Sequence, residues 1–401
     1  MNFNNKYNNF NKNYSYIKNN IKQYAKNNLI RIGSGGSDNI IVIDNDIVMK
    51  IIPIKSSIKS DINKDIIEYK FYEELYSKIV KPNKSPHIVG MYKKYNISIG
   101  KFLPHKCSSK KNSNICCPVF DEVLLGKKTS YIENQLCNLK YAHDNKIIKN
   151  TATCLILEYC PTNISDECYK ILNNKNTKHQ EKNIELSILI NRCIFQVIFT
   201  LAQIQKANKH FIHNDLFLRN VLAINDYNHK INDYIEYIFN NISYYLPANG
   251  IYIKLNDFGY SLNLGSIKSS LSYEIKSSLI INHNYELNNP KRDIYTFLYD
   301  LYNGSNMDGD SLTTIINTSI PKPWIDSYMK NMKKILNQFI NIKTLETIEK
   351  HNPTILQEIF NIHDSELLMK SIKLPNKYFT TSVFDQYTVL PKDANIIKTF
   401  K

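Results

Sequence analysis

The spacing of apolar residues changes along the chain, and this change constrains the fold more than any other feature of the sequence. Short runs rich in β-branched residues occupy positions 29–32, 39–43 and 47–52, with turn-forming residues between them. Such runs predict a three-stranded meander. Between about Asp61 and Tyr76 the apolar residues recur every three or four positions, which predicts a helix after the third strand.

Helical spacing dominates the rest of the chain, although positions 87–95 and 153–159 read as strands. The strongest helix signal is a set of apolar residues three or four positions apart: Leu186, Leu189, Ile190, Cys193, Ile194, Val197, Leu201 and Ile204. The chain after about residue 291 reads as mostly helical. A β-rich first third followed by a helical remainder predicts an α+β protein with a small β-rich lobe and a larger helical lobe.

Composition narrows the class of protein. Apolar residues make up 43% and charged residues 22% of the 401 residues, which is enough for a sizeable core and excludes a disordered protein. The formal net charge of +15 would attract phosphates, nucleic acid or an anionic membrane surface. AT-rich codon usage, which favours Asn, Ile, Lys and Tyr, is the alternative explanation of this charge. Because no basic run is interleaved with stacking aromatic residues, nucleic acid is not expected as the primary ligand.

Two segments carry weak patterns. Residues 1–28 contain five lysines and no acidic residue, and we interpret them as a basic low-complexity tail that could contact anionic surfaces. Residues from about 96 to 152 show little periodicity and are interpreted as an insertion. Eight cysteines without a C-x-x-C pair indicate reduced thiols in a cytosol. No transmembrane segment is expected, because no stretch of about 18 residues is both apolar and uncharged.

A glycine-rich turn lies between the first two predicted strands. Its residues are Ile32, Gly33, Ser34, Gly35, Gly36, Ser37 and Asp38. Glycines allow backbone N–H groups to approach phosphate oxygens without a Cβ in the way, although a glycine-rich hairpin is more often only a turn. The position of this turn, between two strands and not before a helix, argues against a Walker loop and against a dinucleotide-binding fingerprint.

Lys50 is a charged residue inside the otherwise apolar third predicted strand. A lysine in such a strand must either reach water or meet an acidic partner. Glu68, on the predicted helix that follows, is the candidate partner. A simple surface ion pair is the alternative interpretation.

Two polar motifs follow the long predicted helix. The first places Asn220 five residues after Asp215, within a loop that starts at His213. Such a pair offers a carboxylate to orient a hydroxyl and an amide oxygen to hold Mg²⁺, while a polar loop with Asx caps is the alternative. The second motif ends an apolar run in the string Asp-Phe-Gly, where Asp257 could bind a metal ion that bridges phosphates.

The order of these motifs resembles that of the protein kinases. A glycine loop, a strand lysine, a helix glutamate, a hinge, H-x-D-x-x-x-x-N and D-F-G follow one another in this chain as they do in that family. Residues 29 to about 302 therefore look like a protein-kinase catalytic domain. The resemblance implies an N-lobe with the hinge over residues 29–160 and a C-lobe with a C-terminal helical extension over residues 161–401.

The resemblance also implies a role for each motif residue. Lys50 would hold the α- and β-phosphates of ATP and pair with Glu68, and Asp215 would be the catalytic base. Asn220 and Asp257 would bind Mg²⁺ (or Mn²⁺). The other ATP-binding residues would be Ile32, Gly33, Ser34, Gly35, Gly36 and Ile40, with Leu157, Glu158 and Cys160 at the hinge. Asp293, in the string Asp-Ile-Tyr-Thr-Phe, would support the catalytic loop from behind.

Within the kinases, the chain is similar to those of large DNA viruses, especially the poxvirus virion-assembly kinase. The glycine loop reads I-x-x-G-G, a long segment (226–250) lies between the catalytic loop and D-F-G, and the string Leu-Asn-Asp-Phe precedes Gly259. This resemblance implies a Ser/Thr kinase that transfers the γ-phosphoryl group of ATP to hydroxyls of protein substrates. It also implies a location in the infected-cell cytoplasm and in the virion.

Several positions depart from the family pattern. Asp38 replaces the third loop glycine, and no A-P-E string follows D-F-G. Asn214 replaces the usual Arg, so switching by phosphorylation through that Arg is not expected. Phe217 stands where Ser/Thr kinases carry a Lys, and Arg219 stands where tyrosine kinases often carry an Arg. The family resemblance favours Ser/Thr while the Arg219 position favours Tyr, so that choice stays open. Two further alternatives stay open: a pseudokinase or scaffold module, and a small-molecule phosphotransferase of the same fold.

Overall fold

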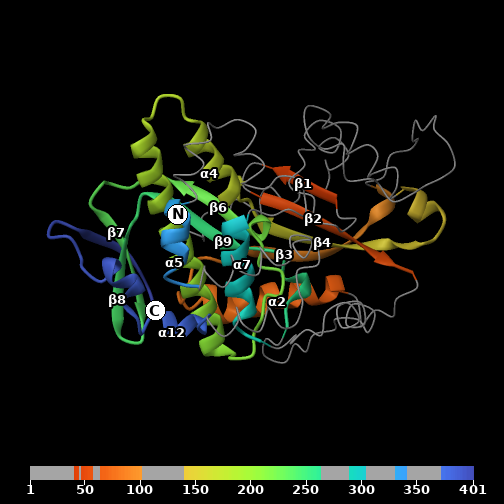
Figure 1. Ribbon diagram of the computed structural model, residues 1–401. Helices are drawn as coiled ribbons and strands as arrows, with labels where there is room; N and C mark the ends of the chain where they lie inside the picture. The colour runs from red at the N-terminus through yellow and green to blue at the C-terminus, as the bar shows by residue number, and fades with distance from the viewer. Residues whose placement is uncertain are drawn as a thin grey trace, which may run out of the picture. The chain divides into compact units, whose positions relative to one another are not determined.

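The computed structural model describes residues 40–44, 47–56, 64–101, 140–262, 289–303, 330–340 and 372–401 (Figure 1). The chain divides into two compact units. The first unit contains residues 1–69 and 90–159, and the second contains residues 70–89 and 160–401. The predicted basic tail and the predicted glycine loop lie outside the described residues.

A four-stranded antiparallel sheet forms most of the described part of the first unit. Its strands are β1 (Ile40–Asp44), β2 (Ile47–Lys55), β3 (Met91–Ser98) and β4 (Ile148–Glu158), in the order β1-β2-β4-β3. β4 buries an unbroken apolar stretch that includes Leu155, Ile156 and Leu157, as a strand inside a sheet requires. The flanks of the predicted insertion, 96–98 and 148–152, belong to paired strands, because the β-ladder continues past the apolar residues that mark these strands in the sequence.

The helix that follows the first two strands is α2 (Lys64–Leu75), close to the predicted range. It continues as a π-helical turn over Tyr76–Val80. The boundary between the two units falls inside α2, after Tyr69. Glu68 and Tyr72, one helical turn apart, are both buried and lie on the same face of α2.

The core of the second unit is built around α5 (His179–Ala207), which packs against α4 (Ile164–Asn173) and α12 (Pro375–Tyr378). The apolar positions that predict this helix are all buried, and residues 192–205 are buried on every side of the helix, which is more than an amphipathic helix would bury. Among the described residues, one helix segment, 180–207, is long and apolar enough to cross a membrane, but 72% of its most apolar window is buried within the structure. That burial is what the central helix of a folded unit shows.

A small sheet beside α5 positions the polar motifs. It contains β5 (Thr162–Asn163), β6 (Val221–Asp226) and β9 (Gly250–Leu255), in the order β5-β6-β9. Val221 lies opposite Leu255, so the residue before β6, Asn220, and the residue after β9, Asn256, are neighbours. The helix α7 (Arg292–Asn303) completes the described surroundings of this loop region.

The long segment 226–250 forms a β-hairpin of β7 (Asp233–Phe239) and β8 (Ile242–Pro247). The C-terminal strand β10 (Asn395–Phe400) pairs in parallel with β7, as Figure 1 shows for the green hairpin and the blue C-terminal segment. A strand at this position departs from the prediction that the chain after residue 291 is mostly helical. The sequence gives little sign of β10 because four of its six residues are exposed, so no alternation of buried residues marks it.

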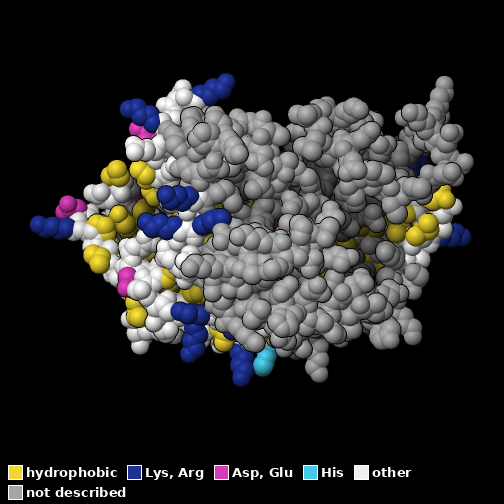
Figure 2. Space-filling view, viewed as in Figure 1, with side chains coloured by type: hydrophobic (Ala, Val, Ile, Leu, Met, Phe, Trp, Pro, Cys, Tyr) yellow, Lys and Arg dark blue, Asp and Glu magenta, His cyan; other side chains and the backbone are white. Residues whose placement is uncertain are grey.

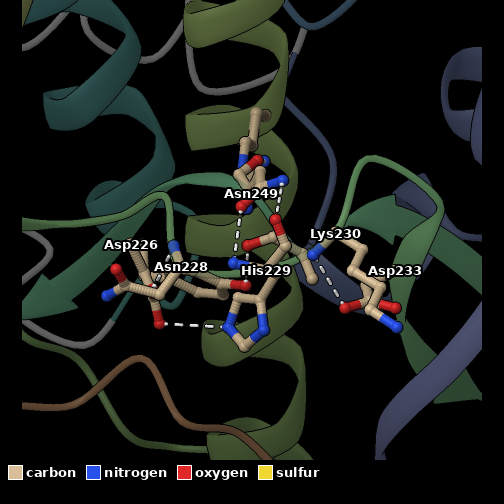
Figure 3. Close-up of polar contacts among 9 residues, drawn as sticks. Asp226, Asn228, His229, Lys230, Asp233 and Asn249 are labelled. Carbon is tan, nitrogen blue, oxygen red and sulfur yellow. Dashed lines mark hydrogen bonds and ion pairs between the residues drawn. The ribbon is translucent and has the colours of Figure 1, made fainter.

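Polar contacts join the two ends of this hairpin, where the chain enters β7 and leaves β8 (Figure 3). Asn249 and His229 exchange hydrogen bonds: the His229 backbone N–H donates to Asn249 Oδ1 at 2.9 Å, and Asn249 Nδ2 donates to the His229 carbonyl at 2.6 Å. The His229 ring lies 3.2 Å from Asp226 Oδ2, and the Lys230 backbone N–H donates to Asp233 Oδ2. Asn395, at the start of β10, donates to the other oxygen of Asp233, so one carboxylate joins the turn to the C-terminal strand.

The described residues contain both helices and strands, which is compatible with the predicted α+β class. Figure 2 shows lysine and arginine side chains spread over the described surface on one face of the molecule, in keeping with the net charge of +15.

Candidate active site

In the first unit, Lys50 on β2 meets Glu68 on α2. Lys50 Nζ donates to Glu68 Oε1 at 2.8 Å and to Oε2 at 2.9 Å. The lysine side chain is 12% exposed and the glutamate side chain 4%, so this is a largely buried, bidentate ion pair and not a surface one. Such a pair is held by both geometry and charge, because either partner alone would leave a desolvated charge.

The pair can be tested without any ligand. Replacing Glu68 by Leu removes the carboxylate that Lys50 contacts, and we expect the free energy of unfolding to fall by about 3 kcal/mol. Adding Lys50→Met should then recover part of this loss, because the double variant buries no lysine charge. Urea unfolding of both single variants and the double variant gives the coupling energy. Strictly additive effects would contradict a structural pairing of these residues.

The hinge candidates lie where the first unit ends. Leu157 is buried in β4, and the Glu158 backbone N–H donates to the Gly90 carbonyl at 2.7 Å. Glu158 Oε2 in turn accepts from the Gly90 backbone N–H at 3.0 Å, which fixes the end of β4 beside the start of β3. Cys160 is buried and is the first residue of the second stretch of the second unit. The predicted loop residues Ile32, Gly33, Ser34, Gly35 and Gly36 lie outside the described residues, as does the side chain of Ile40.

In the second unit, the loop that contains Asp215 is fixed by a buried carboxylate. Asp293, in the first turn of α7, accepts from the backbone N–H of His213 at 2.7 Å and from that of Asn214 at 2.8 Å. Asn214 has a left-handed backbone (φ 68°), a conformation that Asn tolerates better than most residues. Its side-chain amide reaches the Tyr260 carbonyl at 3.4 Å, so the residue that stands in place of the usual Arg contacts the segment after D-F-G.

The Asp215 carboxylate has a defined partner on each oxygen. Asn220 Nδ2 donates to Oδ2 at 2.9 Å and to the Asp215 carbonyl at 2.7 Å, which closes the loop on itself. Arg219 donates to Oδ1 at 2.9 Å, and its guanidinium lies 4.6 Å from the centre of the Phe217 ring. A cation therefore lies beside the Asp215 carboxylate even though Phe217 replaces the family's Lys.

The D-F-G segment lies against this loop. The Asn256 backbone N–H donates to the Asn220 carbonyl at 3.0 Å, and the His213 ring contacts both the Asn256 carbonyl, at 2.9 Å, and the Phe258 ring. Asp257 has a left-handed backbone (φ 60°). These contacts bring Asp215, Asn220 and Asp257 into one neighbourhood of the second unit.

The oxygen ligands here suit a hard divalent cation. Mg²⁺ takes oxygen ligands and is usually held by one or two protein groups together with substrate phosphates. Because the side-chain N–H groups of Asn220 donate to Asp215, the Asn220 Oδ1 is the atom that could bind a metal, and the Asp257 carboxylate would supply charge. Among the described residues, no three His, Cys, Asp or Glu side chains gather as a metal site.

The buried groups of this loop have shifted pKa values. Burial lowers the pKa of His213 to about 4, so its ring is neutral at pH 7. Because the Asn256 carbonyl can only accept, the Nε2 atom must carry the proton. Burial raises the pKa of Asp293 to about 6, although the two backbone N–H donors act in the opposite direction. His87, also in the second unit, has its pKa lowered to about 3 by burial.

These shifts predict how stability depends on pH. As pH falls below 6.5, His87 and His213 bind protons in the unfolded chain but stay neutral in the folded chain. The free energy of unfolding therefore falls. Asp293 opposes them, because from about pH 6 down to 3.8 the folded chain binds a proton that the unfolded chain does not. The net difference of one proton predicts a loss of roughly 1.4 kcal/mol per pH unit between pH 6 and 4.5.

The variant Asp293→Asn removes the carboxyl that binds a proton in the folded chain. The free energy of unfolding should then fall more steeply between pH 6 and 4.5, by roughly 2.7 kcal/mol per pH unit, because only the two histidines contribute. Urea unfolding at several pH values measures both slopes. A slope that becomes shallower in Asp293→Asn would show that the folded protein does not hold a raised pKa at this carboxyl.

The sequence did not predict the contacts that two further residues, Tyr72 and Asp300, make with this region. Tyr72 on α2 donates its hydroxyl to Asn256 Oδ1 at 2.6 Å, accepts from the Asp257 backbone N–H at 3.2 Å, and contacts the Phe258 ring edge-on at 5.1 Å. Asp300 on α7 accepts a hydrogen bond from the backbone N–H of Leu218, in the loop that contains Asp215. The available signals are weak: Tyr72 lies one turn after Glu68, and Asp300 is an acid within an apolar stretch of α7.

Comparison with known proteins places the chain in a family. No family model matches it. A protein of Acanthamoeba polyphaga mimivirus, named "Putative serine/threonine-protein kinase", is 36% identical over 379 residues, which cover 92% of this chain and 91% of that protein. The chain therefore belongs to the protein-kinase family, and its relationship is with the kinases of large DNA viruses.

Proposed function

We propose that the chain is an ATP-dependent Ser/Thr protein kinase that transfers the γ-phosphoryl group of ATP to hydroxyls of protein substrates, with its two compact units as the two lobes. The observation that carries the proposal is the meeting of Asp215, Asn220 and Asp257 in one neighbourhood, closed by the 2.7 Å hydrogen bond between Asn220 and Asp215. By the family resemblance, its place of action is the infected-cell cytoplasm and the virion.

Each residue has a role that its surroundings support. Lys50, fixed by Glu68, contributes positive charge toward the α- and β-phosphates of ATP. Asp215, fixed by Asn220 and Arg219, accepts the proton of the attacking hydroxyl and orients its oxygen. Asn220 and Asp257 hold Mg²⁺, which when bound neutralises the phosphate oxygens. Phosphoryl transfer is catalysed mainly by positioning and charge, and this arrangement offers both.

The preference for Ser/Thr over Tyr rests on two observations of unequal kind. The mimivirus relative is named for serine/threonine specificity. The family resemblance to virion-assembly kinases supports the same choice. Arg219 counts against it, because it stands where tyrosine kinases often carry an Arg, although its ion pair with Asp215 supplies a cation at the carboxylate without the usual Lys.

Phosphoamino-acid analysis tests this specificity. The purified chain would be incubated with γ-labelled Mg-ATP and a mixture of proteins rich in Ser, Thr and Tyr, and the labelled proteins would then be hydrolysed. We expect label on serine and threonine. Label on tyrosine alone would overturn the Ser/Thr assignment, and label only on a sugar or another small molecule in a parallel screen would favour a small-molecule phosphotransferase.

A further inference from the structure

The helix α7 presents two buried carboxylates to the catalytic loop, and the second of them has no assigned role. Asp300 Oδ2 accepts a hydrogen bond from the Leu218 backbone N–H at 2.6 Å. Asp293 holds the start of the loop through His213 and Asn214. The two carboxylates are seven residues apart on α7, which is about two turns or roughly 10 Å, so they lie on the same face of the helix.

We propose that Asp300 is a positioning residue that fixes the end of the catalytic loop and thereby orients Arg219 and Asn220; its catalytic consequence rests on the proposed kinase function. Leu218 begins the short 3-10 turn Leu218–Asn220, and the first N–H of such a turn has no partner inside it. Asp300 supplies that partner. The turn is thus attached to α7 at its first residue.

The chemistry of Asp300 argues for this role. The residue is only 3% exposed, and a buried carboxylate is costly unless hydrogen bonds replace its water. Its neighbours along α7, among them Phe297, Leu298 and Leu301, are buried and apolar. An apolar side chain of similar size would suit these surroundings better, but it would leave the Leu218 N–H without an acceptor.

The hydrogen bonds to Asp293 and to Asp300 hold the loop on both sides of Asp215. Asp215 lies between the residues held by Asp293 and the residue held by Asp300, and Asn220 closes the loop onto the Asp215 carbonyl. Arg219, which contacts Asp215 Oδ1, is the residue directly after the second anchor. Loss of the Asp300–Leu218 hydrogen bond would let the turn shift. The Arg219 guanidinium and the Asn220 amide would then move relative to Asp215.

Matched substitutions at Asp300 separate anchoring from packing. Asp300→Asn keeps a side-chain oxygen that can accept from Leu218, so its kcat should stay within about threefold of wild type. Asp300→Leu removes the acceptor, and we expect kcat to fall about 10- to 100-fold while KM for ATP changes less than about threefold, since a misplacement of about 1 Å costs this much. Leu298→Ala, a buried apolar position on the same helix, is the control for lost packing.

Hydrogen exchange of the backbone tests the anchor independently of turnover. In Asp300→Leu, or in Asp300→Ala if the leucine variant does not fold, amides of residues 218–220 should exchange at least about tenfold faster than in wild type, with no such change in Asp300→Asn. Unchanged exchange of residues 218–220 in the Asp300 variants would show that the Asp300–Leu218 hydrogen bond does not hold the turn. The positioning role would be wrong if Asp300→Asn, or the packing control Leu298→Ala, lost as much kcat as Asp300→Leu. If wild type transfers no phosphate, the proposed function fails, while the exchange result still decides the anchor.

Discussion

Replacing Asp257 by alanine is expected to lower the initial rate of phosphate transfer from Mg-ATP by about 10³-fold or more. The carboxylate is the charged member of the proposed metal site, and a metal ion that neutralises transferring phosphates contributes several kcal/mol to the transition state. The fold should survive the change, because two contacts that hold this segment come from the backbone and are kept. The Asp257 backbone N–H donates to the Tyr72 hydroxyl, and the Asn256 backbone N–H donates to the Asn220 carbonyl. Initial rates at saturating protein substrate measure the effect.

Asp393→Ala is the matched control for this variant, because Asp393 is an exposed aspartate near the C-terminal strand. It should transfer phosphate at the wild-type rate. Thermal unfolding of both variants checks that neither loses its fold. Activity of Asp257→Ala within tenfold of wild type would show that this aspartate is not the principal metal ligand.

Replacing Asp215 by asparagine should lower kcat by about 10²- to 10⁴-fold, which is the usual contribution of a positioned general base. The substitution preserves shape and leaves an oxygen that can accept from Asn220, but it removes the charge that meets Arg219 at 2.9 Å. KM for ATP should change little, because the proposed role of Asp215 is toward the attacking hydroxyl. Steady-state kinetics with varied ATP separates the two constants.

Arg219→Lys provides a comparison for the Asp215 variant, since it keeps a cation near the carboxylate while losing the planar fork of the guanidinium. We expect a smaller loss of kcat in Arg219→Lys than in Asp215→Asn. A kcat of Asp215→Asn within threefold of wild type would rule out a catalytic base at this position.

Much of the fold follows from periodicity in the sequence. The helix predicted from Leu186 to Ile204 lies inside α5, and the run around Lys50 is β2. The positions that predict α5 are all buried, but residues 192–205 are buried on every side, so the helix lies inside the second unit and is not amphipathic there. The pairing of Lys50 with Glu68 is foreseeable from the same kind of argument, since a lysine in an apolar strand needs a partner.

The remainder depends on contacts between distant segments, which local spacing cannot reveal. Tyr72 and Asn256 are 184 residues apart in the chain, and Asp300 and Leu218 are 82 apart. β10 is a strand because it pairs with β7, which precedes it by more than 150 residues, and not because its own residues alternate. The glycine-loop residues stay predictions, since they lie outside the described part of the chain.

A comparison of two labels of ATP tests directly whether Asp215 and Asp257 belong to a phosphotransfer site. The purified wild-type chain would be incubated with Mg²⁺ and a mixed protein substrate, with label either on the γ- or on the α-phosphate, beside Asp215→Asn and Asp257→Ala. We expect protein-bound label from γ-labelled ATP only, and its loss in both variants. Absence of transfer by wild type, or equal transfer by the two variants and wild type, would contradict the claim that these residues form a phosphotransfer site.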